Sequence, residues 1–269
     1  MGAYFIRRRS RTALYRRVLS SYVQKATEAG VTQAVFPEGG LSRDGLIGKP
    51  KLGILSYMIE GWRHDGRDVV FVPVSLNYDR VVEDRILVAS ERSAGRQFRA
   101  TIPEGVRFSL RYVIRRLLGK VSRFGVAGVV FGRPVSLRDI AAEAPETVVQ
   151  NLADRLMREI KSDLPVVAVP LVVASLVRRG APSSTEEIAA DARALADRVP
   201  SDTVMFDDSE LDEAAVARQL DILVLRHILE KNGGRYSVFD HEIAAYYANS
   251  LLPHLGEEPT KSLKPAASE

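Results

Sequence analysis

Hydrophobic residues in the first two thirds of the chain follow two alternating spacings. Short apolar runs bounded by Gly, Pro or charged residues predict strands, and apolar residues three and four positions apart predict helices. The predicted strands cover residues 3–6, 32–36 and 68–78, with a further strand and turn at 125–137. The predicted helices cover residues 11–29, 51–66, 107–119 and 138–162, the last with an interruption near Pro145. Strands that alternate with helices predict an α/β layer architecture.

The run DVVFVPVSLNY, residues 68–78, is continuously apolar and rich in β-branched residues. Such a run is typical of a strand that is buried on both faces of a parallel sheet. We therefore expect an α/β fold, a mostly parallel sheet with flanking helices, plus a helical C-terminal part. The expected domains are the α/β domain at 1–180, a helical subdomain at 181–255 and a disordered polar tail at 256–269.

The pattern becomes helical from about residue 183. Ser184 and Glu187 have the spacing of a capping box, which predicts that a helix begins there. A second long amphipathic helix is predicted over residues 210–231, before the sequence NGG at 232–234.

Charge is distributed unevenly along the chain. Residues 1–180 hold 30 Lys and Arg against 17 Asp and Glu, a net charge of +13, whereas the remainder holds 8 against 17, or −9. A basic first part indicates an anionic partner, such as a phosphorylated metabolite, an acidic membrane surface or nucleic acid. The arginines are not interleaved with stacking aromatic residues, so nucleic acid is not an expected partner.

The chain has no Cys, which excludes disulfides, thiolate nucleophiles and zinc sites built on Cys. Its longest apolar stretch, LPVVAVPLVVASLV at 164–177, is too short to span a bilayer as a helix and contains two prolines. We expect this segment to be buried or interfacial, and we expect no transmembrane helix. The same segment and the basic helix at 107–119 are candidates for contact with a membrane surface.

The stretch VFPEGGLSRDG, residues 35–45, concentrates polar chemistry after a predicted strand. Ligands bind at the carboxyl ends of strands in open α/β sheets. Glycines let the backbone approach a ligand, and backbone amides with Arg43 suit a phosphate group. Lys49 and Lys51, at the start of the next helix, would add positive charge. The glycine spacing fits neither a Walker A loop nor a dinucleotide fingerprint, and taken alone the stretch is equally compatible with a connecting turn.

These residues also carry a resemblance to a known family. FPEGGLSRDG, followed by KPKLGIL, resembles the third conserved block of the glycerol-3-phosphate acyltransferase family, which belongs to the glycerolipid acyltransferases. GAYFIRR (2–8) is similar to the second block, and VFVPVSLNYDRVVE (70–83) is similar to the fourth. FGRPVSL (131–137) and AYYANSLLPHL (245–255) are similar to further family segments. The order of these segments is kept along nearly the whole chain, and the third and fourth blocks together make the resemblance specific.

The resemblance implies transfer of a fatty acyl group from acyl-CoA or acyl-carrier protein to the 1-hydroxyl of glycerol 3-phosphate, in phospholipid biosynthesis. It implies no cofactor and no metal; the partners are glycerol 3-phosphate, the acyl thioester and the cytoplasmic face of the cell membrane, bound peripherally. The residues implied to line the glycerol 3-phosphate pocket are Arg8, Glu38, Gly39, Gly40, Ser42, Arg43, Lys51 and Pro73. Glu38 is expected to orient Arg43, Arg8 or the amides of the turn. Leu41 departs from the family pattern, because bacterial members usually carry Arg there.

The family takes its catalytic base from a first block, His-x4-Asp, in which Asp orients the His. The four histidines are His64, His227, His241 and His254, and none has Asp five positions later. We expect His64 to lie in a solvated loop, and His227 and His254 to be packing or surface residues.

No catalytic residue is therefore assigned. The simplest interpretation is an N-terminally truncated acyltransferase, a partial gene or a misplaced start, which is inactive as this chain. Without its first strands, the sheet is expected to expose an edge or an apolar face. The alternative is a non-catalytic membrane-surface protein that binds phosphorylated glycerol or lipid.

Overall fold

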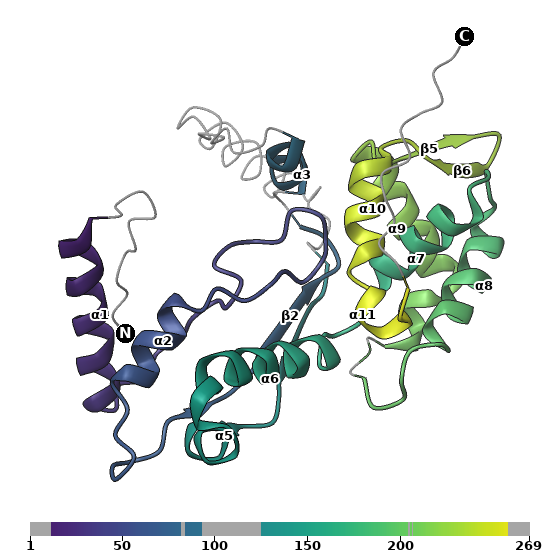
Figure 1. The fold of residues 1–269 in the computed structure, drawn as a ribbon. Helices are drawn as coiled ribbons and strands as arrows, with labels where there is room; N and C mark the ends of the chain where they lie inside the picture. The colour runs from purple at the N-terminus through teal and green to yellow at the C-terminus, as the bar shows by residue number, and fades with distance from the viewer. Residues whose placement is uncertain (1–11, 82–83, 93–124, 204, 206, 258–269) are drawn as a thin grey trace, which may run out of the picture. The chain divides into compact units, whose positions relative to one another are not determined.

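The computed structural model describes residues 12–81, 84–92, 125–203, 205 and 207–257 (Figure 1). The chain divides into two compact units, each of which is described by itself. Unit 1 comprises Met1–Gly40, Gly48–Val74 and Phe131–Lys161; unit 2 comprises Leu41–Ile47, Ser75–Val130 and Ser162–Glu269. The strand predicted at 3–6, the helix predicted at 107–119 and nearly all of the predicted tail lie outside the described residues.

Unit 1 combines helices with a short strand pair. Its elements are α1 (Ala13–Glu28), α2 (Gly53–Glu60), β1 (Val70–Phe71), β4 (Val135–Ser136), α5 (Leu137–Glu143), the 3₁₀ turn η1 (Pro145–Thr147) and α6 (Val148–Ser162). The hydroxyl of Thr12 caps α1 by accepting the N–H of Tyr15 at 3.3 Å, and Gly30, with φ of 67°, follows its end. The predicted helix at 11–29 is thereby confirmed. The core of unit 1 is built from apolar residues of α1, α2, α5 and α6, including Val23, Leu55, Leu137 and Leu152.

Unit 2 is mostly helical. Its elements are β2 (Val74–Tyr78), α3 (Asp84–Arg92), β3 (Ala127–Phe131), α7 (Ala168–Arg179), α8 (Thr185–Ala196), the 3₁₀ turn η2 (Asp208–Leu211), α9 (Glu213–Leu225), β5 (Leu229–Asn232), β6 (Arg235–Val238), α10 (His241–Asn249) and α11 (Leu252–Leu255). The predicted capping box is confirmed: Ser184 Oγ accepts the Glu187 N–H at 3.2 Å, and the Glu187 carboxylate accepts the Ser184 N–H at 2.8 Å.

The apolar stretch at 164–177 forms the centre of unit 2. Every residue of α7 from Ala168 to Leu176 is buried, and helices α8 and α10 pack against it (Figure 1). Pro170 is tolerated because it lies in the first turn, where its missing N–H has no helical partner. The stretch was expected to be buried or interfacial, and burial is confirmed. Its proposed contact with a membrane surface was therefore wrong. Among the described residues, no helix is both long and apolar enough to cross a membrane.

The described strands form two-stranded sheets, and the mostly parallel sheet is not confirmed. β1 pairs with β4 in antiparallel register, Val70 opposite Ser136, and β5 pairs with β6 in the same sense. The run at 68–78 is also not buried on both faces. Its β2 part alternates, with Ser75 1% exposed and Leu76 40% exposed. An exposed apolar face was expected, and β2 presents one.

Further elements differ from the sequence prediction, among them the helix predicted over 51–66, which spans only Gly53–Glu60. Residues 32–36 form no strand; they have no regular hydrogen-bonded partner among the described residues, and Phe36 is exposed. The helix predicted over 210–231 ends at Leu225, and its last residues instead form strand β5. Gly233 and Gly234 both adopt positive φ, 56° and 79°, which suits the two-residue turn of a β-hairpin. The NGG signal therefore marks a hairpin turn.

A buried polar network joins three segments of unit 2. The carboxylate of Asp84, 1% exposed, accepts Arg226 Nη2 at 2.6 Å and the hydroxyl of Tyr247 at 2.8 Å. The Tyr247 oxygen in turn accepts the N–H of Val81 at 3.0 Å. Burial of the phenol, and then the neighbouring Asp84 charge, raise the pKa of Tyr247 well above its usual range.

The raised pKa of Tyr247 predicts a loss of stability in strong alkali. The phenol stabilises the folded state fully below the pKa of an unfolded tyrosine, about 10, and this contribution is lost as pH rises from there toward the higher folded pKa. We expect the free energy of unfolding to fall above about pH 10, by up to ~1.4 kcal/mol per pH unit from this group. Urea unfolding at a series of pH values measures the slope.

Tyr247→Phe removes the titrating group, so its slope above about pH 10 should be shallower than that of the parent chain. Tyr22→Phe, at an exposed tyrosine on α1, is the matched control and should leave the slope unchanged. Equal slopes for the parent chain and Tyr247→Phe would contradict the assignment.

Candidate functional site

The predicted phosphate loop begins in unit 1 with a tight turn. Gly39, with φ of 67°, donates its N–H to the Phe36 carbonyl at 2.9 Å. The N–H of Lys51 donates to the Pro37 carbonyl at 2.8 Å, and the Lys51 side chain lies across Gly39. A β-carbon on Gly39 would come within 3.2 Å of Lys51 Cδ. The structure thus brings Gly39 and Lys51 together.

In unit 1, Glu38 connects the segment that ends at Gly40 to the segment that begins at Gly48. Its carboxylate accepts the Gly48 N–H at 2.7 Å, across ten positions of sequence. The expected partners were Arg43, Arg8 or an amide of the turn at 35–45; the observed donor, Gly48, lies just beyond that turn, and Arg8 lies outside the described residues. Gly40 is exposed, with open space where a β-carbon would be.

Ser42 and Arg43 belong to unit 2, in a turn that closes on itself. The Ser42 hydroxyl donates to the Leu46 carbonyl at 2.9 Å, and the Leu46 N–H donates to the Asp44 carboxylate at 3.0 Å. Arg43, which follows Ser42 in this turn, is exposed. Because the Ser42 hydroxyl already donates within the turn, donation to a phosphate would require it to leave the Leu46 carbonyl.

Sequence reasoning missed the support beneath this turn. Asn249, at the end of α10, donates its side-chain N–H to the Asp44 carbonyl at 2.8 Å. Gly45, with φ of 79°, approaches α10 so closely that a β-carbon would lie 1.9 Å from the Tyr246 carbonyl oxygen. The available signal was the segment AYYANSLLPHL, which resembles the family but gives no indication of what it contacts.

Pro73, predicted to shape the wall of the site, is a buried residue of unit 1. Its carbonyl accepts the Gly132 N–H at 2.9 Å, and having no N–H it separates β1 from β2. In unit 2, β2 is followed by Asp79 and Arg80. The Asp79 carboxylate, 5% exposed, accepts the N–H groups of Val126 at 3.0 Å and Val169 at 3.3 Å, so that it caps the first turn of α7.

His64, His227 and His254 have the structural surroundings that the sequence predicts. His64 is exposed and packs against the Trp62 ring, with centroids 4.4 Å apart. His227 is exposed after α9, and the His254 ring is bonded to the Leu164 carbonyl through Nε2 at 2.7 Å. Within the described part of the chain, no three His, Asp or Glu side chains gather in a way that would hold a metal ion.

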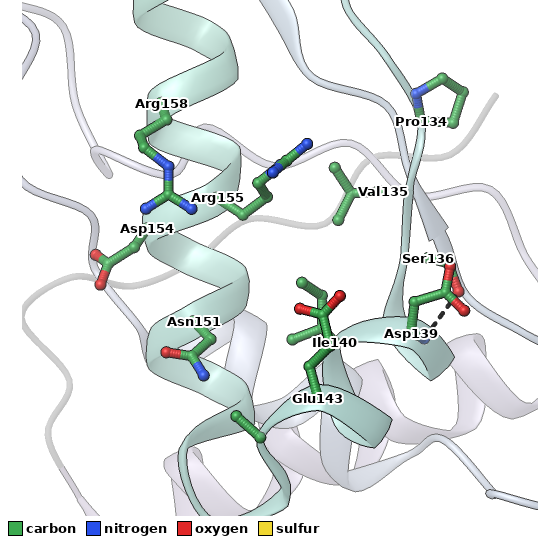
Figure 2. Close-up of a pocket in the computed structure, with 11 residues that line it drawn as sticks. Pro134, Val135, Ser136, Asp139, Ile140, Glu143, Asn151, Asp154, Arg155 and Arg158 are labelled. Carbon is green, nitrogen blue, oxygen red and sulfur yellow. Dashed lines mark hydrogen bonds between the residues drawn. The ribbon is translucent and has the colours of Figure 1, made fainter.

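Unit 1 also contains a hollow of about 500 Å³, and the side chains that line it are drawn in Figure 2. Its walls are Pro134, Val135, Ser136, Asp139, Ile140, Glu143, Ala144, Asn151, Asp154, Arg155 and Arg158. Arg155 is already paired with Glu159 at 3.0 Å, and carboxylates outnumber guanidinium groups around the hollow. This charge balance does not favour a phosphate ligand, and the hollow contains none of the predicted site residues.

Two family models match the chain. Residues 1–77 match the acyltransferase family, and residues 108–258 match the C-terminal region of glycerol-3-phosphate acyltransferase. The class indicated by the first match is that of acyltransferases. The second covers more than half of the chain, and the chain belongs to the glycerol-3-phosphate acyltransferase family.

Curated relatives agree with this assignment. A glycerol-3-phosphate acyltransferase of Xanthomonas campestris is 33% identical over 156 residues, which are 57% of this chain and 17% of the relative. Proteins of the same name from Ectopseudomonas mendocina and Pseudomonas fluorescens SBW25 are 28% identical over 215 residues, 72% of this chain and 24% of each relative. The chain thus matches a quarter or less of the length of these relatives.

Proposed function

We propose that this chain binds glycerol 3-phosphate as part of a glycerol-3-phosphate 1-O-acyltransferase, which takes a fatty acyl group from acyl-CoA or acyl-carrier protein. The observation that carries the proposal is the family match over residues 108–258, which is joined by relatives of that name. The proposed pocket residues are those of the resemblance, from Arg8 to Pro73. Membrane-surface contact on the cytoplasmic side is part of the same proposal.

The chemistry of the turn supports this role for Arg43 in particular. A phosphate dianion is held best by guanidinium forks and by backbone N–H groups. Arg43 is exposed on a turn whose backbone is held internally, so binding would not have to order the chain first. Fixing the phosphate would then leave the 1-hydroxyl at the other end of the substrate free to face a thioester.

Arg43→Ala is expected to weaken the binding of glycerol 3-phosphate about tenfold or more, because a charge-assisted hydrogen bond is worth roughly 1.5–3 kcal/mol. Isothermal titration of glycerol 3-phosphate into the parent chain and the variant measures the dissociation constants. Arg63→Ala is the control, because Arg63 is an exposed arginine of the other unit, paired with Asp65. Equal affinity of Arg43→Ala and the parent chain would remove Arg43 from the site.

The 269 residues contain no His with Asp five positions later, so the base of the family mechanism is not among them. We therefore expect this chain to bind glycerol 3-phosphate without acylating it. Incubation with palmitoyl-CoA and labelled glycerol 3-phosphate, followed by extraction of labelled lipid, tests the expectation. Turnover that scales with the concentration of this chain would show that a different group acts as the base.

Helix α1 of unit 1 is the surface we propose for contact with an anionic membrane. Leu14, Val18 and Tyr22 recur every four residues and are 74%, 59% and 55% exposed. Arg17 and Lys25 are exposed on the same side, and Glu28 is the helix's single acid. An apolar stripe with basic neighbours suits an interfacial helix.

The double substitution Leu14→Ser with Val18→Ser should reduce binding to vesicles of phosphatidylglycerol and phosphatidylcholine several-fold, because both side chains would otherwise enter the interface. Vesicle flotation measures the bound fraction. Leu225→Ser with Phe239→Ser changes two exposed apolar residues of unit 2 and serves as the control. If the α1 variant floats like the parent chain, α1 is not the contact surface.

A further inference from the structure

The turn at 41–47 and helix α10 form a continuous contact within unit 2, although some two hundred positions separate them in sequence. Asn249 is 4% exposed, so its side chain is removed from water where it meets the turn. Its Nδ2 atom donates to the carbonyl oxygen of Asp44, with the two atoms 2.8 Å apart. A buried polar group that lacked this partner would be costly, so the pair holds both segments in register.

The turn is fitted to α10 by its backbone as well. Gly45 has φ of 79°, a left-handed conformation that favours glycine, and its α-carbon faces the carbonyl oxygen of Tyr246. Any β-carbon there would collide with that oxygen, at 1.9 Å. Two adjacent residues of the turn, Asp44 and Gly45, therefore rest on α10 immediately after Arg43.

Helix α10 is itself held rigidly. Asp240 caps its first turn by accepting the N–H of Ile243 at 3.1 Å, and Ile243 and Ala244 are buried in the core of unit 2. Tyr247 anchors the middle of the helix to the buried carboxylate of Asp84 at 2.8 Å. Because these contacts hold α10 in place, they also hold the turn that packs on it.

We propose that Asn249 is a positioning residue for the phosphate-binding turn: through the Asp44 carbonyl it holds Arg43 in place for glycerol 3-phosphate. The inference rests on the proposed function and extends it to a residue on another element. Asn249 does not touch the substrate. Its contribution is to order the turn before binding, because ordering a loop during binding subtracts from affinity.

Asn249→Ala is expected to weaken glycerol 3-phosphate binding about five- to tenfold in calorimetric titration, the range expected for one hydrogen bond. It should also increase amide hydrogen exchange of a peptide covering residues 42–46 in the absence of ligand. The matched control is Asn77→Ala, because Asn77 also donates from a partly buried amide to a distant carbonyl of unit 2, that of Pro165 at 2.9 Å. Asn77→Ala should leave the affinity and the exchange of the turn unchanged.

Gly45→Ala tests the same contact from the side of the turn, and it decides the matter if Asn249→Ala fails to fold. Its control is Gly233→Ala, because Gly233 also has positive φ, 56°, but has open space where a β-carbon would be. Gly45→Ala should weaken binding several-fold, and Gly233→Ala should not. This comparison separates loss of the contact with α10 from backbone strain alone.

The results separate failure of the positioning role of Asn249 from failure of glycerol 3-phosphate binding itself. If the parent chain binds glycerol 3-phosphate and both Asn249→Ala and Gly45→Ala bind it equally well, the positioning role is overturned while the proposed function stands. If calorimetric titration detects no binding of glycerol 3-phosphate to the parent chain, and glycerol 3-phosphate does not slow amide hydrogen exchange at residues 42–46, the proposed function and the positioning role both fail.

Discussion

The buried carboxylate of Asp84 joins α3, the end of α9 and α10 in unit 2 through Arg226 and Tyr247. A charge that is 1% exposed is tolerated only when it is paired and hydrogen-bonded, and Arg226 and Tyr247 supply both. Removing one partner of such a pair typically costs about 3–5 kcal/mol, because the other charge is left buried alone. The same contact fixes α10 through Tyr247, and α10 carries Asn249, on which the turn with Arg43 rests. Within unit 2, the turn with Arg43 therefore rests on a helix that this buried network holds in place.

Features that depend on neighbouring residues could be predicted from the sequence. Helix α1 and the capping box of Ser184 and Glu187 were found because their signals lie within a few positions. Predictions that depended on distant packing failed more often. The run at 68–78 is apolar throughout, and only its partner strand and surroundings decide that alternate residues face solvent. The helix predicted to reach residue 231 ends at Leu225, and residues 229–232 form a hairpin strand because Gly233 and Gly234 favour a turn.

The candidate site shows the same division. Gly39 and Lys51 are twelve positions apart and do meet, and Glu38 binds an amide of its own loop. The contact of Asn249 with Asp44 joins segments that are 205 positions apart, and the sequence of neither segment indicates this contact. The resemblance to a family supplied both segments but not their contact. Candidate binding residues could therefore be nominated from the sequence, whereas a candidate positioning residue such as Asn249 could not.

The central proposal is that the turn at 41–47 of unit 2, through Arg43, binds the phosphate of glycerol 3-phosphate. Amide NMR of the isotope-labelled chain during titration with glycerol 3-phosphate, with glycerol as the uncharged control, tests it most directly. We expect saturable shifts at the amides of Ser42, Arg43 and Asp44 that glycerol does not produce. Shifts confined to other regions, such as the hollow lined by Arg155, or no shifts at all, would contradict it.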